Sequence, residues 1–224
     1  MGGDTLSDLN ITKFDKLIEY LPNVRAASCG PGASCIFIRG LSTDSPGLQI
    51  TGTAGERVLV TGPSGAVGSA AVQLAKRRGA EVIAMAGDAK ADSVRSLGAS
   101  QVMPRDANLV SLFGQEHFDA AVDIVGGAQF GEILNVLKRG GRYGVSGAIS
   151  ASVVDLDLRA LYLNDLRLIG CTVLEPEVFA NFVSYIERGE IWPVVAATYD
   201  LSDIVKAQET FLTKKHVGKI VLSL

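Results

Sequence analysis

From residue 55 onward, short apolar runs alternate with longer stretches whose apolar residues recur every three or four positions. The apolar runs are typical of strands buried on both faces and predict strands at Arg57–Thr61, Glu81–Ala86, Ser100–Met103, Phe118–Ile124, Gly141–Val145 and Arg167–Val173. The stretches between them predict helices at Val67–Arg78, Ala91–Leu97, Asn108–Phe113, Phe130–Leu137 and Leu156–Leu163. Strands that alternate with helices in this way predict an α/β fold with a parallel sheet.

The two flanks of this region have a different pattern. Residues 1–54 are rich in turn residues, with an apolar helical face at Ile11–Leu21 and a short apolar run at Cys35–Gly40 that predicts a strand. After the sixth strand, the pattern predicts a helix, a strand, a second helix and a last strand, at Glu175–Arg188, Val194–Leu201, Ser202–Lys214 and Lys219–Leu224.

The composition narrows the class of protein. The chain has 224 residues and a formal net charge of −3 without a basic block, which argues against nucleic acid or an acidic membrane surface as a partner. No run of 18 apolar residues predicts a membrane span. The first ten residues, MGGDTLSDLN, lack the apolar core of a signal peptide and carry acids, so a cytoplasmic location is expected.

The cysteines and histidines do not match a metal-binding pattern. Five residues separate Cys29 from Cys35, which suits neither a zinc knuckle nor a redox pair, and Cys171 lies far away. His117 and His216 are not paired in a metalloprotease-like motif. We therefore expect three buried or free thiols, with a disulfide between the first two cysteines as the alternative, and no zinc site.

A glycine-rich turn, VTGPSGAVGSA, joins the strand at Arg57–Thr61 to the helix that follows. Gly62 lets the chain turn out of the strand, Gly65 leaves room for a pyrophosphate, and Gly68 lets the helix pack closely on the sheet. The N–H groups at the start of the helix would then face the anion, and Ser64 could add a hydroxyl donor. The strand before the turn and the strand after the helix favour a dinucleotide site over a purely structural turn.

The end of the second strand normally decides which dinucleotide binds, because an acid there accepts hydrogen bonds from the adenosine ribose and repels a 2′-phosphate. Here Gly87 stands near the expected position of the acid, and Asp88 follows late. Lys90 lies in the next turn and Arg105 lies after the third strand. The small residue and the two cations favour NADP over NAD. Asp88 argues mildly for NAD, and each cation is also open to interpretation as a surface charge.

Several motifs occur together in the order of one enzyme family: AGERVLVTGPSGAVGSAAVQLAKRRGAEVIA, SLGASQVM, FDAAVDIVGG, LKRGGRYGVSGA, LRLIGC and HVGKIVL. The region from Gly55 to Leu224 resembles the C-terminal half of medium-chain dehydrogenases/reductases of the quinone-oxidoreductase-like kind. The resemblance implies a Rossmann domain, a doubly wound parallel sheet of six strands, that binds NADPH. It also implies pairing of two subunits at the sixth strand, and hence a homodimer.

The resemblance implies a set of cofactor-binding residues. The diphosphate would lie on the turn formed by Gly62, Ser64, Gly65, Ala66, Val67 and Gly68. The 2′-phosphate would lie near Gly87, Lys90 and Arg105, although the family commonly has a tyrosine at the position of Arg105. The remaining lining residues would be Val125, Gly126, Ser146, Gly147, Cys171, Thr172 and Val173, the last three near the nicotinamide. Lys219 would approach from the last strand, with a surface role equally open.

Members of this family carry a second, GroES-like catalytic domain that is mostly N-terminal to the Rossmann domain. Residues 194–224 resemble a remnant of it, which leaves residues 55–193 as the Rossmann domain. Residues 1–54 instead resemble the start of the plug domain of TonB-dependent outer-membrane receptors, through LSDLNITKFDKLIEYLPNV, GPGAS and IFIRGLSTDS. The chain thus resembles a chimera of two incomplete modules.

Three functions are therefore open. The first is an NADPH-dependent oxidoreductase for quinones or other activated double bonds, with a truncated catalytic domain and no nominated catalytic acid, base or nucleophile. The second is a dinucleotide-binding module with little or no turnover. The third is a fragment of a membrane receptor, which fits only residues 1–54.

Overall fold

A computed structural model describes residues 24–28, 34–38, 51–171 and 176–223, and divides the chain into two units, Met1–Gly40 and Leu41–Leu224. In the first unit, β1 (Val24–Ser28) pairs antiparallel with β2 (Ser34–Ile38). The sequence pattern predicted only the second of these strands, because the glycines and proline between them made the whole stretch look like a turn. The helix predicted at residues 11–21 lies outside the described residues, as does most of the stretch that resembles a receptor plug.

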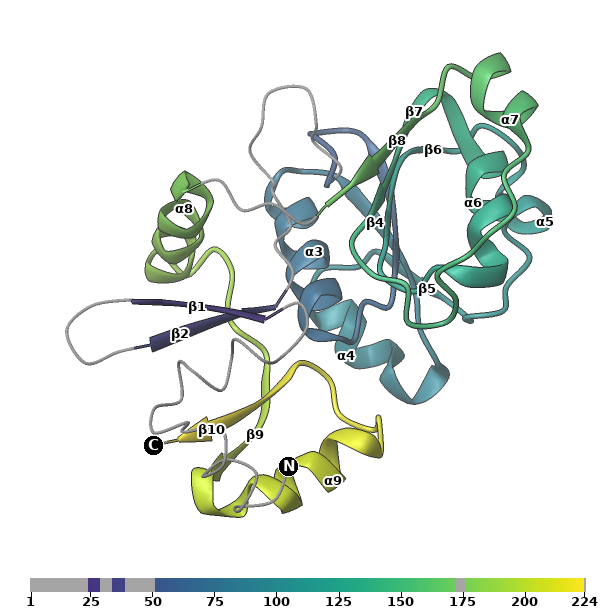
Figure 1. The fold of residues 1–224 in the computed structure, drawn as a ribbon. Coiled ribbons are helices and arrows are strands. Elements are labelled where there is room, and N and C mark those ends of the chain that lie inside the picture. The colour runs from purple at the N-terminus through teal and green to yellow at the C-terminus, as the bar shows by residue number, and fades with distance from the viewer. Residues whose placement is uncertain (1–23, 29–33, 39–50, 172–175, 224) are drawn as a thin grey trace. The chain divides into compact units, whose positions relative to one another are not determined.

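The second unit contains the predicted parallel sheet (Figure 1). Its six strands are ordered β5-β4-β3-β6-β7-β8, and every neighbouring pair is parallel. The order reverses between β3 and β6, as in doubly wound Rossmann folds, so the predicted fold class is confirmed. The strands are β3 (Arg57–Thr61), β4 (Glu81–Met85), β5 (Gln101–Met103), β6 (Phe118–Asp123), β7 (Leu137–Val145) and β8 (Arg167–Gly170).

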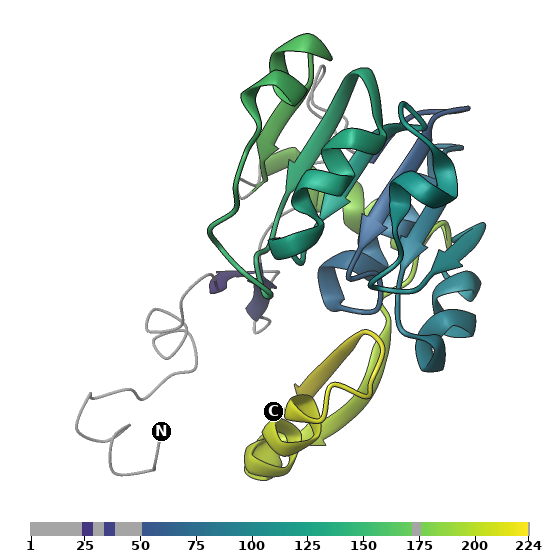
Figure 2. The same cartoon turned by 90° about the vertical axis from the view of Figure 1, so that its right-hand side faces the viewer.

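Helices cover both faces of the sheet (Figures 1 and 2). Val58 and Val60 of β3 pack with Val72 on one face, while Leu59 of the same strand packs with Ile133 on the other. All five side chains are fully buried, which explains the uninterrupted apolar run of residues 58–60 in β3, without the alternation of a half-exposed strand. The helices of this part are α3 (Ala66–Arg77), α4 (Ala91–Ser96), α5 (Leu109–Phe113), α6 (Phe130–Val136) and α7 (Leu158–Leu163), with short 3-10 turns at Asp88–Lys90 and Gly127–Gln129.

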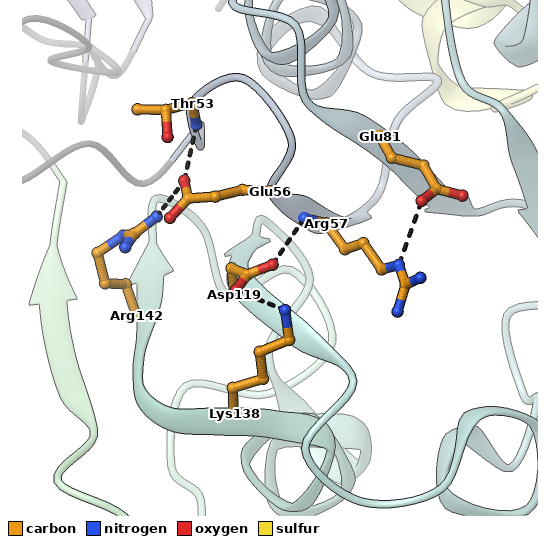
Figure 3. Close-up of polar contacts among 7 residues, drawn as sticks. All are labelled: Thr53, Glu56, Arg57, Glu81, Asp119, Lys138 and Arg142. Carbon is orange, nitrogen blue, oxygen red and sulfur yellow. Dashed lines mark hydrogen bonds and ion pairs between the residues drawn. The ribbon is translucent and has the colours of Figure 1, made fainter.

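Charged side chains link β3, β6 and β7 near the residue where β3 begins (Figure 3). The glycine turn follows the other end of β3. The Asp119 carboxylate accepts hydrogen bonds from the Arg57 N–H at 2.8 Å and from the Lys138 ammonium at 2.7 Å. Nearby, Arg142 donates to Glu56 at 2.7 Å. Burial alone would raise the pKa of both carboxyls, but their hydrogen bonds and cationic partners outweigh it and lower both pKa values. This cluster therefore stabilises the fold at neutral pH.

The C-terminal part contains α8 (Pro176–Glu187), β9 (Val195–Asp200), a 3-10 turn (Leu201–Asp203), α9 (Ile204–Leu212) and β10 (Lys219–Ser223). β9 and β10 form a parallel pair of their own. Gln73 of α3 connects this part to the sheet, since its side chain donates to the Trp192 carbonyl at 3.0 Å and accepts from the Trp192 N–H at 2.9 Å. Within the described residues, no helix combines the length and apolar character of a membrane span.

Candidate functional site

The glycine turn has the close packing that its spacing predicts. Gly62 directly follows β3 and has a φ of +59°, a conformation that favours glycine. The Gly65 N–H donates to the Gly62 carbonyl at 3.2 Å, which closes the turn. A Cβ at Gly68 would lie 2.1 Å from the same carbonyl oxygen, so only glycine lets α3 start this close to the strand end.

The amino end of α3 leaves room for an anion. Gly65 precedes the helix with φ −80° and ψ 174°, and the nearest atom to a Cβ built there is 3.6 Å away. No side chain caps the helix, and its first turn, which includes Ala66 and Val67, contains no acid. The unsatisfied N–H groups and the helix dipole make such an end favourable for a phosphate. The turn therefore has space and N–H donors for an anion, and protein packing does not require glycine at position 65.

A hollow of about 340 Å³ lies at the end of β4, lined by residues 87–90 and 104–106. Gly87 and Arg105 face each other in it, because a Cβ at Gly87 would lie 3.5 Å from the guanidinium. Lys90 contributes a second cation, whereas Asp88 and Asp106 add acids to the rim. The structure thus brings together the three residues predicted to meet a 2′-phosphate, in a hollow of mixed charge.

Lys90 has partners that the sequence pattern did not indicate. Its ammonium donates to the carbonyl oxygens of Lys214 at 2.6 Å and His216 at 2.8 Å. Burial lowers the pKa of Lys90, and the nearby charges of Arg105 and Lys214 lower it further. The loop between α9 and β10 therefore lies against the hollow.

A buried carboxylate organises the end of β6. Asp123 is 1% exposed and accepts hydrogen bonds from the Thr61 hydroxyl and the Tyr143 hydroxyl, each at 2.5 Å. It also accepts from the N–H groups of Val125 at 2.8 Å and Gly126 at 3.0 Å. Burial and the neighbouring carboxylate raise the pKa of Tyr143, so this phenol remains protonated and serves as a donor. The acid fixes the backbone of two predicted cofactor-lining residues, a role that we did not predict although an acid in an apolar strand was a visible signal.

The ends of β7 and β8 meet at the same edge of the sheet. The Ser146 N–H donates to the Asp123 carbonyl at 2.9 Å, and its hydroxyl donates to the Cys171 carbonyl at 3.2 Å. A Cβ at Gly147 would lie 2.4 Å from the Ile124 carbonyl oxygen, which requires glycine there. Burial raises the pKa of the Cys171 thiol, so this cysteine is not activated as a nucleophile. The predicted residues Thr172 and Val173 lie outside the described residues.

The last strand reaches the glycine turn through its backbone. Lys219, the predicted contact, begins β10 and has an exposed side chain. The preceding residue contacts the turn, since the Gly218 N–H donates to the Ser64 carbonyl at 2.9 Å. The approach of Lys219 to the cofactor stays a prediction.

The histidines are packed against aromatic rings. His117 lies against Phe113 and Phe118, and His216 against Phe211, with ring centroids 4.8–5.5 Å apart. Burial lowers the pKa of both histidines. In the part of the chain that the structure describes, no three His, Cys, Asp or Glu side chains are grouped as metal ligands. The absence of zinc from the whole protein stays a prediction.

Comparisons with known proteins place these features in a family context. The family model described as zinc-binding dehydrogenase matches residues 66–188. A putative quinone oxidoreductase of Bacillus subtilis is 30% identical over 190 residues, which cover 79% of this chain and 57% of the relative. A crystal structure of a putative alcohol dehydrogenase from Sinorhizobium meliloti is 42% identical with a TM-score of 0.72, over 78% of this chain and 50% of that one.

A further solved structure contains a cofactor. It is a 2-octenoyl-CoA carboxylase reductase in complex with NADP and 2-octenoyl-CoA, 25% identical with a TM-score of 0.72, over 81% of this chain and 46% of that one. The chain therefore spans only about half the length of the proteins that it matches.

Proposed function

We propose that this chain, which belongs to the zinc-binding dehydrogenase family, binds NADPH and acts as an oxidoreductase on quinones or other activated double bonds. Residues 55–193 would be the dinucleotide-binding domain, residues 194–224 a part of the catalytic domain, and residues 1–54 a separate segment. The names of the quinone oxidoreductase relative and of the 2-octenoyl-CoA reductase support this class of substrate.

The open space over Gly65, at the amino end of α3, carries the proposal. A glycine that neither the backbone conformation nor the packing requires is explained by a ligand that must approach the backbone closely. The turn from Gly62 to Gly68 would hold the diphosphate through its N–H groups. Arg105 and Lys90, on the two sides of the hollow at Gly87, would hold the 2′-phosphate and so favour NADP over NAD.

The bound nicotinamide would supply a hydride to an electron-poor carbon of the substrate. The chain itself would bind and orient the two molecules. Val125 and Gly126 at the end of β6, with Ser146 and Gly147 after β7, would line the nicotinamide end of the cofactor. Asp123 would keep the first two in place through their N–H groups. Hydride transfer leaves an anion on the substrate, and water would supply the proton that completes the reduction. Positioning the substrate over the nicotinamide would supply much of the rate, so we nominate no catalytic acid or base.

A calorimetric titration of the protein with NADPH tests the proposal. We expect saturable binding that is tighter than the binding of NADH, and the loss of all dinucleotide binding would overturn the proposal. A second assay follows NADPH oxidation in the presence of a quinone. Binding without quinone-dependent oxidation would favour the alternative function, a dinucleotide-binding module with little or no turnover.

We also propose a homodimer formed at the β8 edge of the sheet. β8 is the last strand in the order, and Leu168 on it is 39% exposed. The neighbouring α7 exposes Tyr162 and Leu163. An apolar sheet edge of this kind is favourable for pairing with a second copy. Light scattering at micromolar concentration should give twice the monomer mass, and a monomer alone would refute the pairing.

A further inference from the structure

The loop between α9 and β10, residues 213–218, contacts the candidate dinucleotide site at two separate points. The Gly218 N–H donates to the carbonyl of Ser64, in the turn predicted to hold the diphosphate. The carbonyls of Lys214 and His216 accept from Lys90, beside the hollow predicted to hold the 2′-phosphate. More than 120 residues separate Lys90 from these two carbonyls in the sequence, so the contact is a product of the fold.

The position of the loop is fixed by its own backbone. Gly218 has a φ of +89°, and a Cβ there would lie 2.2 Å from the Val194 carbonyl oxygen. The adjacent N–H of Lys219 donates to the same carbonyl at 2.8 Å. The loop is therefore held where β10 begins, and its carbonyls present a fixed surface to Lys90.

The two hydrogen bonds to carbonyl oxygens leave the Lys90 ammonium able to bind a further, anionic partner. A lysine ammonium has three N–H donors, of which these bonds use two. A free lysine side chain loses considerable rotamer freedom when it binds an anion, and prior immobilisation removes that loss. Arg105 and Lys214 place further positive charge near Lys90, and a phosphate would relieve that repulsion.

We propose that the carbonyls of Lys214 and His216 hold the Lys90 ammonium in position for the 2′-phosphate, which makes the loop of residues 213–218 a determinant of NADP preference. This rests on the proposed function. Because coupling between two sites is reciprocal, a bound 2′-phosphate must in turn stabilise the loop and the elements next to it. NADH, which lacks that phosphate, occupies the same turn without this effect.

Two insertions test the positioning role. Two glycines inserted after Thr213 would add slack between α9 and the anchor at Gly218, so that the carbonyls of Lys214 and His216 no longer hold Lys90 in one position, without changing any side chain of the hollow. We expect NADPH to bind about tenfold more weakly and NADH to bind unchanged, the scale of one charge-assisted hydrogen bond. The matched control is the same insertion after Gly114, where φ is +75° and a Cβ would meet no atom within 4 Å. The control should leave both affinities unchanged.

Hydrogen exchange measured by mass spectrometry tests the reciprocal effect. At saturation, NADPH should slow exchange of the amides in residues 204–223 more than NADH does. Lys90→Met should remove this difference, Lys90→Arg should retain it, and Lys215→Met should not affect it, because Lys215 is an exposed cation of the same loop. If Lys90→Met does not fold, the arginine variant still tests whether a cation at this position is sufficient.

The outcomes separate the two proposals. If the parent protein binds neither dinucleotide, the proposed function fails and this inference fails with it. If NADPH binds tightly but protects residues 204–223 no more than NADH does, only the inference is overturned. It is also overturned if the insertion after Thr213 weakens NADPH and NADH equally, since the loop would then support the fold without selecting the phosphate.

Discussion

The substitution Gly65→Leu distinguishes the role of Gly65 in ligand binding from its role in the packing of the turn. The φ of −80° and ψ of 174° at Gly65 are open to any residue, and a Cβ there would meet its nearest atom, the Gly62 carbonyl oxygen, at 3.6 Å. A leucine should therefore be accommodated by the folded chain. Its side chain would extend over the amino end of α3, where the diphosphate is expected to approach.

The expected change in stability is small and the expected change in binding is large. Replacing glycine reduces the number of conformations open to the unfolded chain, which stabilises the folded state by about 0.4–1 kcal/mol. Leucine is a poorer helix N-cap than glycine, and this lowers the free energy of unfolding by about the same amount. The two effects nearly cancel, so the melting temperature should move by no more than about 4 °C. Blocking two charge-assisted hydrogen bonds to the phosphates, each worth about 1.5–3 kcal/mol, should weaken NADPH binding by about 100-fold or more.

Thermal melts and calorimetric titration with NADPH measure these two effects in the same preparations. Gly68→Ala is the contrasting variant, because its Cβ would lie 2.1 Å from the Gly62 carbonyl oxygen. It should lower the melting temperature clearly, whereas Gly65→Leu should not. A folded Gly65→Leu protein that binds NADPH as tightly as the parent would refute the assignment of the turn to the diphosphate. A Gly65→Leu protein that unfolds would refute the separation of packing from binding.

Three further predictions concern the hollow, the buried Asp123 and the charged cluster of Glu56 and Asp119. The double variant Lys90→Ala, Arg105→Ala should weaken NADPH by about 10–100-fold and NADH far less in calorimetric titrations, and equal losses would exclude a 2′-phosphate role. Asp123→Asn should lower the free energy of unfolding in urea by about 2–4 kcal/mol, because an amide cannot accept all four of its hydrogen bonds; an unchanged urea midpoint would contradict this. The folded pKa values of Glu56 and Asp119 are lowered, so their stabilisation is present above their ordinary pKa values and is lost as the pH falls through the folded ones. Melts from pH 7 to pH 3 should therefore show a smaller loss in the doubly neutralised Glu56→Gln, Asp119→Asn variant than in the parent, and parallel curves would contradict the assignment.

The strands of the sheet were predictable because burial on both faces leaves a plain apolar run. β3 coincides with the predicted Arg57–Thr61, and β4 and β6 end one residue earlier than predicted. β7 differs most, since it begins at Leu137 and not at Gly141. The residues after Leu137, KRGG, are charged or glycine and so resemble a turn, yet Leu137 pairs with Phe118 across an irregular register. Pairing with a neighbouring strand decided this boundary, and pairing is not visible in the local pattern.

The glycine turn was predictable for a similar reason, because the demands on Gly62 and Gly68 are local to one strand and one helix. The Asp123 cluster was not predicted, since its donors come from β3, β7 and the residues after β6. A carboxylate is acceptable in an apolar interior only when several donors surround it. The letter sequence FDAAVDIVGG shows the acid but not the donors, and only the strand order brings them together.

The contact of the C-terminal loop with the site shows a different limit. The family resemblance drew attention to Lys219, which it places near the cofactor from the last strand, with a surface role equally open. In the structure the contacts to the site come from backbone atoms of Gly218, Lys214 and His216. Every residue carries a carbonyl, so its use as a hydrogen-bond acceptor leaves no signature in residue type. What residue type does record is the need for glycine at position 218, where φ is positive and Val194 is too close for a side chain. In this loop, the glycine fixes the path of the chain and the path places the carbonyls that hold Lys90.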